Sequence, residues 1–170
     1  MDPFATLGIA RTFDVDVGAL EKNHRKLSRA VHPDRHMAAG ASEKREALAR
    51  AMDVNEAWRI VRDPIRRAEA LLSLSGLQVA EGREPQLGPE FLMWMLEQRE
   101  ALAVARSAHD IGKVQALGRI IRARGAQVER DLSAGLAHGP SEAMVAKVGE
   151  LRFYRRFLDE VSALEDEIAA

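Results

Sequence analysis

The sequence contains no cysteine. This absence excludes disulfide bonds, thiol catalysis, zinc sites built on thiolates and metal clusters ligated by the chain's own cysteines. Aromatic residues make up only 5% of the 170 residues, whereas alanine, leucine, arginine and glutamate are abundant. Because these abundant residues favour helices and aromatic residues favour strands, the composition predicts a globular, all-α chain.

Long apolar runs and a strong net charge are also missing. The longest apolar run, from Phe91 to Leu96, is far shorter than the ~20 residues of a membrane span, and no signal-peptide pattern opens the chain. The formal net charge of −1 argues against binding nucleic acid by bulk charge. We therefore expect a cytoplasmic protein with no membrane and no nucleic acid among its partners.

Glycine and proline are concentrated in one internal stretch, residues 76–88, which also lacks helical periodicity. Such a composition is typical of a connection between folded units. The sequence thus predicts two helical domains, at 1–75 and 89–170, joined by a linker at 76–88.

The first domain is predicted to contain two long antiparallel helices with a short helix at either end. Helical periodicity and breaker residues place them at residues 3–7, 17–31, 42–61 and 64–74. Asp16 and Ser42 are the expected N-caps of the two long helices, and Pro33 ends the first of them. The predicted core consists of Leu7, Leu20, Leu27, Leu48, Val54 and Trp58.

The second domain is predicted to be a three-helix bundle. Pro89 starts a helix that runs to about residue 108, Asp110 and Ser141 cap the next two, and Gly139 ends the middle one. Apolar steps of three and four residues, typical of a bundle, mark one seam on each helix. The seams are Leu92, Met95, Arg99, Leu102 and Ala103; then Val114, Leu117, Ile121, Val128, Leu132 and Leu136; then Met144, Val148, Leu151, Leu158, Val161 and Ile168.

His32-Pro33-Asp34 lies between the two long helices of the first domain, and a basic helix face leads into it. Four residues form that face, opposite the apolar side of their helix: Lys22, Arg25, Lys26 and Arg29. One interpretation is a simple turn beside a solvated face. The other is a rigid loop that presents an imidazole and a carboxylate to a partner protein.

A second unusual surface is predicted where the second domain begins. Residues 91–96 are apolar on all sides, although a bundle helix needs only one apolar stripe. An extra, partly acidic face is formed by Met93, Leu96, Glu97 and Glu100. On the last helix, Phe153 and Phe157 lie slightly off the apolar seam. These residues either pack against the rest of the chain or form a groove for another protein.

Residues 25–35, Arg-Lys-Leu-Ser-Arg-Ala-Val-His-Pro-Asp-Arg, resemble the J-domain family, whose members stimulate ATP hydrolysis by heat-shock chaperones. The resemblance implies that the 1–75 domain is a J-domain. It also implies which residues bind the chaperone: His32, Pro33 and Asp34 of the loop, and Lys22, Arg25, Lys26 and Arg29 of the basic face.

Four further motifs resemble, in their order and spacing, those of the HscB-type co-chaperones of iron–sulfur cluster assembly. They are Asp63-Pro64-x-x-Arg67-Ala68-Glu69-x-Leu71-Leu72, Phe91-Leu92-Met93, Leu96-Glu97-x-Arg99-Glu100 and Leu151-Arg152-Phe153. The resemblance covers almost the whole chain and implies an HscA- or DnaK-type chaperone partner, cluster transfer and maturation of iron–sulfur proteins. It implies that an IscU-type scaffold protein is bound by Leu92, Met93, Leu96, Glu97, Glu100 and Phe153. Val104 stands at a position of this patch that is usually acidic.

Enzymatic activity, a resident metal and other cofactors are not expected. His32-x-Asp34-x-His36 is a poor metal site because its side chains alternate in direction around a proline, and the Glu21-x-x-His24 element has no second copy. No phosphate loop or Gly-x-Ser-x-Gly motif is present. Two alternatives to the scaffold co-chaperone remain: a general J-domain protein with a different client, and a structural helical adaptor with an inert loop.

Overall fold

The computed structural model describes residues 1–31, 40–77 and 87–169. These ranges form seven α-helices and no strand, which confirms the all-α prediction. Contacts between Cα atoms divide the chain into two compact units, Met1–Gln78 and Val79–Ala170. Most of the predicted linker at 76–88 lies outside the described residues. In the part of the chain that the structure describes, no helix combines the length and apolarity that a membrane span requires.

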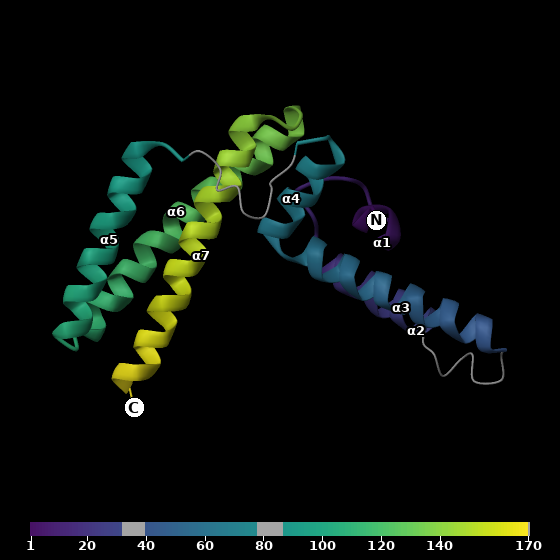
Figure 1. The fold of residues 1–170 in the computed structure, drawn as a ribbon, viewed down its shortest axis with the longest axis horizontal. Coiled ribbons are helices and arrows are strands. Elements are labelled where there is room, and N and C mark those ends of the chain that lie inside the picture. The colour runs from purple at the N-terminus through teal and green to yellow at the C-terminus, as the bar shows by residue number, and fades with distance from the viewer. Residues whose placement is uncertain (32–39, 78–86, 170) are drawn as a thin grey trace. The chain divides into compact units, whose positions relative to one another are not determined.

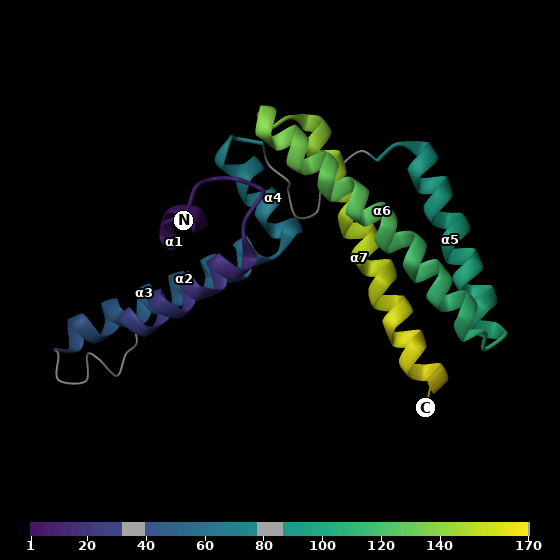
Figure 2. The same ribbon diagram turned by 180° about the vertical axis from the view of Figure 1, so that it is seen from behind.

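The first unit consists of α1 (Pro3–Leu7), α2 (Val17–Ala30), α3 (Ala41–Arg62) and α4 (Pro64–Leu74). The long helices α2 and α3 lie side by side, and α1 packs on α3 (Figure 1, Figure 2). The predicted bounds of α1 and α4 agree with the structure, and those of α2 and α3 differ from it by one residue, at the end of α2 and at both ends of α3.

Aspartates begin three of these four helices. The side chain of Asp16 accepts a hydrogen bond from the N–H of Ala19 (3.0 Å), and that of Asp63 accepts one from the N–H of Arg66 (3.0 Å). The Asp16 cap was predicted and is confirmed. The predicted Ser42 cap is wrong, because α3 begins at Ala41 with the extended Gly40 as its N-cap, so that Ser42 already lies in the first turn.

Asp2 caps α1 and also holds the following loop. Its carboxylate accepts hydrogen bonds from the N–H groups of Phe4 (3.0 Å) and Ala5 (3.2 Å) and forms an ion pair with Arg11 (2.6 Å). Partial burial acts to raise the pKa of Asp2, but these hydrogen bonds and Arg11 outweigh it and lower the pKa below its usual value. The charged form of Asp2 therefore stabilises the folded state.

Replacing Asp2 by alanine is expected to lower the unfolding free energy of the first unit at pH 7 by about 0.5–2 kcal/mol, as for other N-caps. Because the folded-state pKa is lowered, the contribution is present above the unfolded pKa and is lost as the pH falls through the folded pKa. Urea unfolding of D2A and of the parent protein, followed by Trp58 fluorescence in a Trp94→Phe background, measures the difference. A gap between the two proteins that stays constant from pH 7 to pH 3 would contradict this assignment.

The core of the first unit is built from both long helices and both short ones. Leu7, Leu20 and Val54 are buried as predicted, whereas Leu27 and Trp58 are only half-buried. Leu48 is 52% exposed, so its placement in the core was wrong. Three of the buried positions of α3, Ala47, Val54 and Val61, are seven residues apart and form a line along the helix, and Leu48 lies about 100° around the helix from that line. The remaining buried apolar residues are Phe4, Phe13, Ala57, Ile65, Ala68, Leu71 and Leu72.

The second unit is a three-helix bundle of α5 (Pro89–Ser107), α6 (Ile111–His138) and α7 (Glu142–Ala169). The helices α6 and α7 form an antiparallel hairpin, and α5 packs alongside it (Figure 1, Figure 2). Pro89 is the first residue of α5, Asp110 caps α6, and Gly139 ends α6 with a φ of 119°, all as predicted. Gly118 allows α6 to approach α7 closely, because a Cβ at this position would lie 3.1 Å from a methyl carbon of Val161.

The predicted seams of the bundle are only partly correct. On α6 and α7 most predicted seam residues are buried, and the remaining ones, Leu117, Leu136, Met144, Leu158 and Ile168, are half-buried. On α5 only Met95 and Leu102 are buried, joined by Ala105, while Leu92, Arg99 and Ala103 are exposed. Phe157, expected off the seam of the last helix, is fully buried. The inward face of α5 is thus rotated from the predicted one, and this leaves large apolar residues on its outer face.

Candidate functional site

The three loop residues His32, Pro33 and Asp34 lie outside the described residues, as does His36. The structure does describe the helix that leads to them. On α2, the four predicted basic residues Lys22, Arg25, Lys26 and Arg29 are all exposed. Arg25 forms an ion pair with Glu21, and the other three have no ion-pair partner within the described ranges. The basic face is therefore positively charged and exposed to solvent.

The opposite side of α2 is fixed by specific contacts. The ring of His24 stacks on Trp58 of α3 with centroids 4.7 Å apart, and its Nε2 lies 3.1 Å from Oδ1 of Asn55. The side chain of Asn23 donates a hydrogen bond to the carbonyl of Leu7 (2.6 Å). These contacts hold α2 in one rotation about its axis, so the basic face points away from α3. Among the described residues, no group of three or more histidine, aspartate or glutamate side chains is placed to hold a metal ion.

The second predicted surface lies on α5. We call it the α5 face; it consists of Leu92, Met93, Leu96, Glu97 and Glu100. Its three apolar side chains are 45%, 59% and 50% exposed, respectively. All five positions fall within about 140° of the helix circumference, on the side opposite the buried seam. Val104, which is 66% exposed, continues the same face by one turn.

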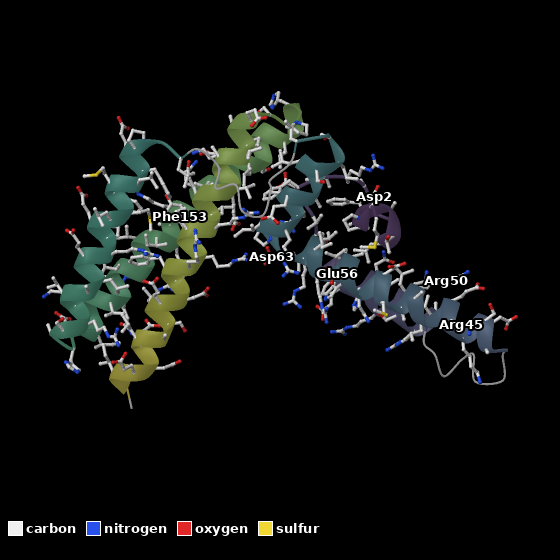
Figure 3. All side chains as sticks on the ribbon, viewed as in Figure 1. Asp2, Arg45, Arg50, Glu56, Asp63 and Phe153 are labelled. Atoms are coloured by element: carbon white, nitrogen blue, oxygen red, sulfur yellow. The ribbon has the colours of Figure 1, made fainter. Side chains whose placement is uncertain are left out.

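Phe153, labelled in Figure 3, lies on α7 and contacts the first turn of α5. It is half-buried, and its ring meets that of Phe91 edge to face with centroids 5.8 Å apart. The guanidinium of Arg156 lies 4.5 Å from the centre of the Phe153 ring. Phe91 directly precedes Leu92 but lies about 100° around the helix from it, toward the buried seam. The contact therefore joins Phe153 to the first turn of α5, although the two phenylalanines are about sixty residues apart in sequence.

Aromatic contacts behind the α5 face support it. Trp94 packs edge to face on Tyr154 with centroids 6.2 Å apart, and the guanidinium of Arg124 lies 3.9 Å above the Trp94 ring. Burial raises the pKa of Tyr154, so the phenol stays neutral at physiological pH. The three residues come from three different helices and therefore fix the first turns of α5 against the α6–α7 hairpin.

A groove between α5 and α7 was not predicted from the sequence. Two ion pairs cross it, Arg99–Glu160 (3.2 Å) and Arg106–Glu167 (2.9 Å), and its volume is about 340 Å³. The rest of the groove is lined by Leu102, Ala103, Ala163 and Leu164. The two arginines are seven residues apart, as are the two glutamates, and this matched spacing is the only sign of the groove in the sequence.

Comparisons with known protein families match both units. Residues 2–70 match the model of the DnaJ domain, and residues 87–162 match the model described as the HSCB C-terminal oligomerisation domain. Together the two models account for most of the helical chain.

Similar proteins align over nearly the whole chain. The Co-chaperone protein HscB homolog of Paraburkholderia phymatum is 35% identical over 93% of this chain and 90% of its own length. The homolog of Burkholderia multivorans is 38% identical over 89% and 86%, respectively. Among solved structures, chaperone HscB from Vibrio cholerae has a TM-score of 0.88 at 28% identity and covers 99% of both chains. Human co-chaperone protein HscB has the same fold, with a TM-score of 0.88 at 23% identity over 96% of this chain and 81% of that one.

Proposed function

Since the chain belongs to the HscB family of J-domain co-chaperones, we propose that it brings an IscU-type iron–sulfur scaffold protein to a heat-shock chaperone of the HscA or DnaK type. In this proposal residues 1–75 act as the J-domain, 76–88 as the linker and 89–170 as the scaffold-binding bundle.

The J-domain contacts the chaperone. The exposed basic face of α2, formed by Lys22, Arg25, Lys26 and Arg29, docks on an acidic surface, and its positive charge also speeds the encounter. The loop residues His32, Pro33 and Asp34 then accelerate ATP hydrolysis by the chaperone. The stack of His24 on Trp58 supports this role, because it keeps the basic face turned outward.

The scaffold protein binds to the α5 face together with Phe153. The observation that carries this assignment is the exposure of three neighbouring large apolar residues, Leu92, Met93 and Leu96, on a helix that already has a buried seam. Fully burying one such side chain against a partner contributes about 1.5–3 kcal/mol. Glu97 and Glu100 border the apolar residues and would pair with basic groups of the scaffold.

The cluster stays on the scaffold throughout. This chain has no cysteine and so offers no thiolate to receive a cluster. Hydrolysis of ATP locks the chaperone onto the scaffold, and this step promotes transfer of the cluster to recipient proteins. The role of this chain is to bring two proteins together and to trigger the hydrolysis.

Single-turnover ATP hydrolysis by the chaperone tests the proposal. We expect this protein to raise the hydrolysis rate, and we expect a further rise when the scaffold is added, because only the ternary complex brings both partners together. Stimulation that is indifferent to the scaffold would favour a general J-domain protein with a different client. A rate unchanged by this protein would favour a structural helical adaptor.

A further inference from the structure

Building on the scaffold binding proposed above, we infer that the groove between α5 and α7 receives an apolar side chain of the scaffold protein. The α5 face would then supply one part of the contact and the groove its anchoring pocket. The inference assigns a role in partner binding to Leu102, Ala103, Ala163 and Leu164, none of which belongs to the α5 face.

The groove has an apolar floor and small walls. Leu102 and Leu164 form the floor and are 4% and 7% exposed. The walls include the exposed alanines Ala103 and Ala163, whose short side chains leave the space between the helices unfilled. The volume of about 340 Å³ is that of roughly eleven water molecules at about 30 Å³ each, which is enough for a large side chain and part of its neighbours.

The charges at the groove favour a neutral occupant. Arg99 and Glu160 pair across it, and Arg106 and Glu167 pair across it two turns further on. Each positive charge thus faces a negative one, and the lining carries no net charge. A charged side chain would lose hydration there without gaining a partner, whereas an apolar side chain would displace poorly held water from the leucine floor.

The groove is continuous with the proposed scaffold-binding surface. The positions 92, 96, 99, 103 and 106 follow one another at steps of four and three, so they form a single row along α5. The first two are Leu92 and Leu96 of the α5 face, and the last three line the groove. A partner segment lying along this row meets the exposed leucines first and the groove within the next two turns.

Filling the groove tests the inference. The double substitution Ala103→Leu/Ala163→Leu places two larger side chains in it, at exposed helical positions that tolerate leucine. We expect scaffold affinity, measured by isothermal titration calorimetry, to fall about 10- to 100-fold, the loss that follows from excluding one large apolar side chain. The matched control is Ala123→Leu/Ala126→Leu on the exposed face of α6, for which we expect no change in affinity.

A direct observation accompanies the titration. The methyl NMR signals of Leu102 and Leu164 in the parent protein are expected to shift when the scaffold is added, and those of Leu71 and Leu72 in the first unit are not. Unchanged or tighter binding by the groove-filled variant, or unmoved Leu102 and Leu164 signals, would overturn the inference.

Leu96→Ser, titrated in parallel, separates this inference from the function it rests on. If Leu96→Ser weakens scaffold binding and the groove-filled variant binds normally, the groove inference fails and scaffold binding by the α5 face stands. If Leu96→Ser also binds normally, the proposed scaffold surface itself fails and the inference fails with it.

Discussion

Replacing Asp34 by asparagine is expected to abolish stimulation of the chaperone's ATPase and to leave scaffold binding unchanged. Asparagine keeps the size of the side chain but removes its negative charge, so a cationic group of the chaperone loses its partner. Truncating one member of a buried, charged hydrogen-bonded pair costs about 2–5 kcal/mol, which corresponds to roughly 30- to 5000-fold in a rate or an affinity. Single-turnover hydrolysis in the presence of D34N should therefore fall to the basal rate.

A matched control for D34N lies in the same unit. Asp53 is exposed on α3, and Asp53→Asn makes the same chemical change away from the loop and from the basic face. We expect D53N to stimulate as the parent protein does. If D34N stimulated equally well, the loop would be inert, and the structural adaptor would become the better description.

Replacing Leu92, Leu96 and Phe153 together by serine should have the opposite effect. Burying the three apolar side chains contributes several kcal/mol to binding, so we expect scaffold affinity to fall by at least about 100-fold. Chaperone stimulation without scaffold should be unchanged, because these residues lie in the second unit, whereas the basic face of α2 lies in the first. Calorimetry with the scaffold and the single-turnover assay measure the two effects separately.

Phe153 requires a second variant, because its contact with Phe91 also supports α5. The double substitution Leu92→Ser/Leu96→Ser changes only exposed positions and should still weaken binding more than tenfold. Leu48→Ser/Met52→Ser makes the same kind of change on the exposed side of α3 and serves as the control. A Leu92/Leu96 variant that binds as tightly as this control would contradict the assignment of the α5 face.

Local signals in the sequence were sufficient to place the helices. Pro64 and Pro89 are the first residues of α4 and α5, and Asp16 and Asp110 cap α2 and α6, because proline and capping side chains act on their own neighbours. Gly40 was missed as the start of α3, since glycine offers no side-chain cap by which to recognise it.

The packing faces were harder to predict because they depend on tertiary contacts. Ala47 and Leu48 are adjacent and both apolar, and only the packing of α3 against the other helices of its unit decides that the smaller residue turns inward. On α5, apolar residues surround the first turns, so the sequence allowed several seams, and the buried one includes the small Ala105. The groove depends on pairs such as Arg99–Glu160, which are sixty-one residues apart. The seven-residue spacing within each helix indicates these pairs only once α5 and α7 are known to lie side by side.

The division of the described chain into two compact units has a consequence for how tightly each partner must be held. When two binding sites are carried by one polypeptide, each bound partner experiences the other at a local concentration that reaches the order of millimolar. Under the proposed function, a scaffold held only at micromolar affinity would still meet the chaperone efficiently. Each individual contact can then remain weak enough to dissociate within one ATP cycle, which allows a small amount of co-chaperone to serve many scaffold molecules in turn.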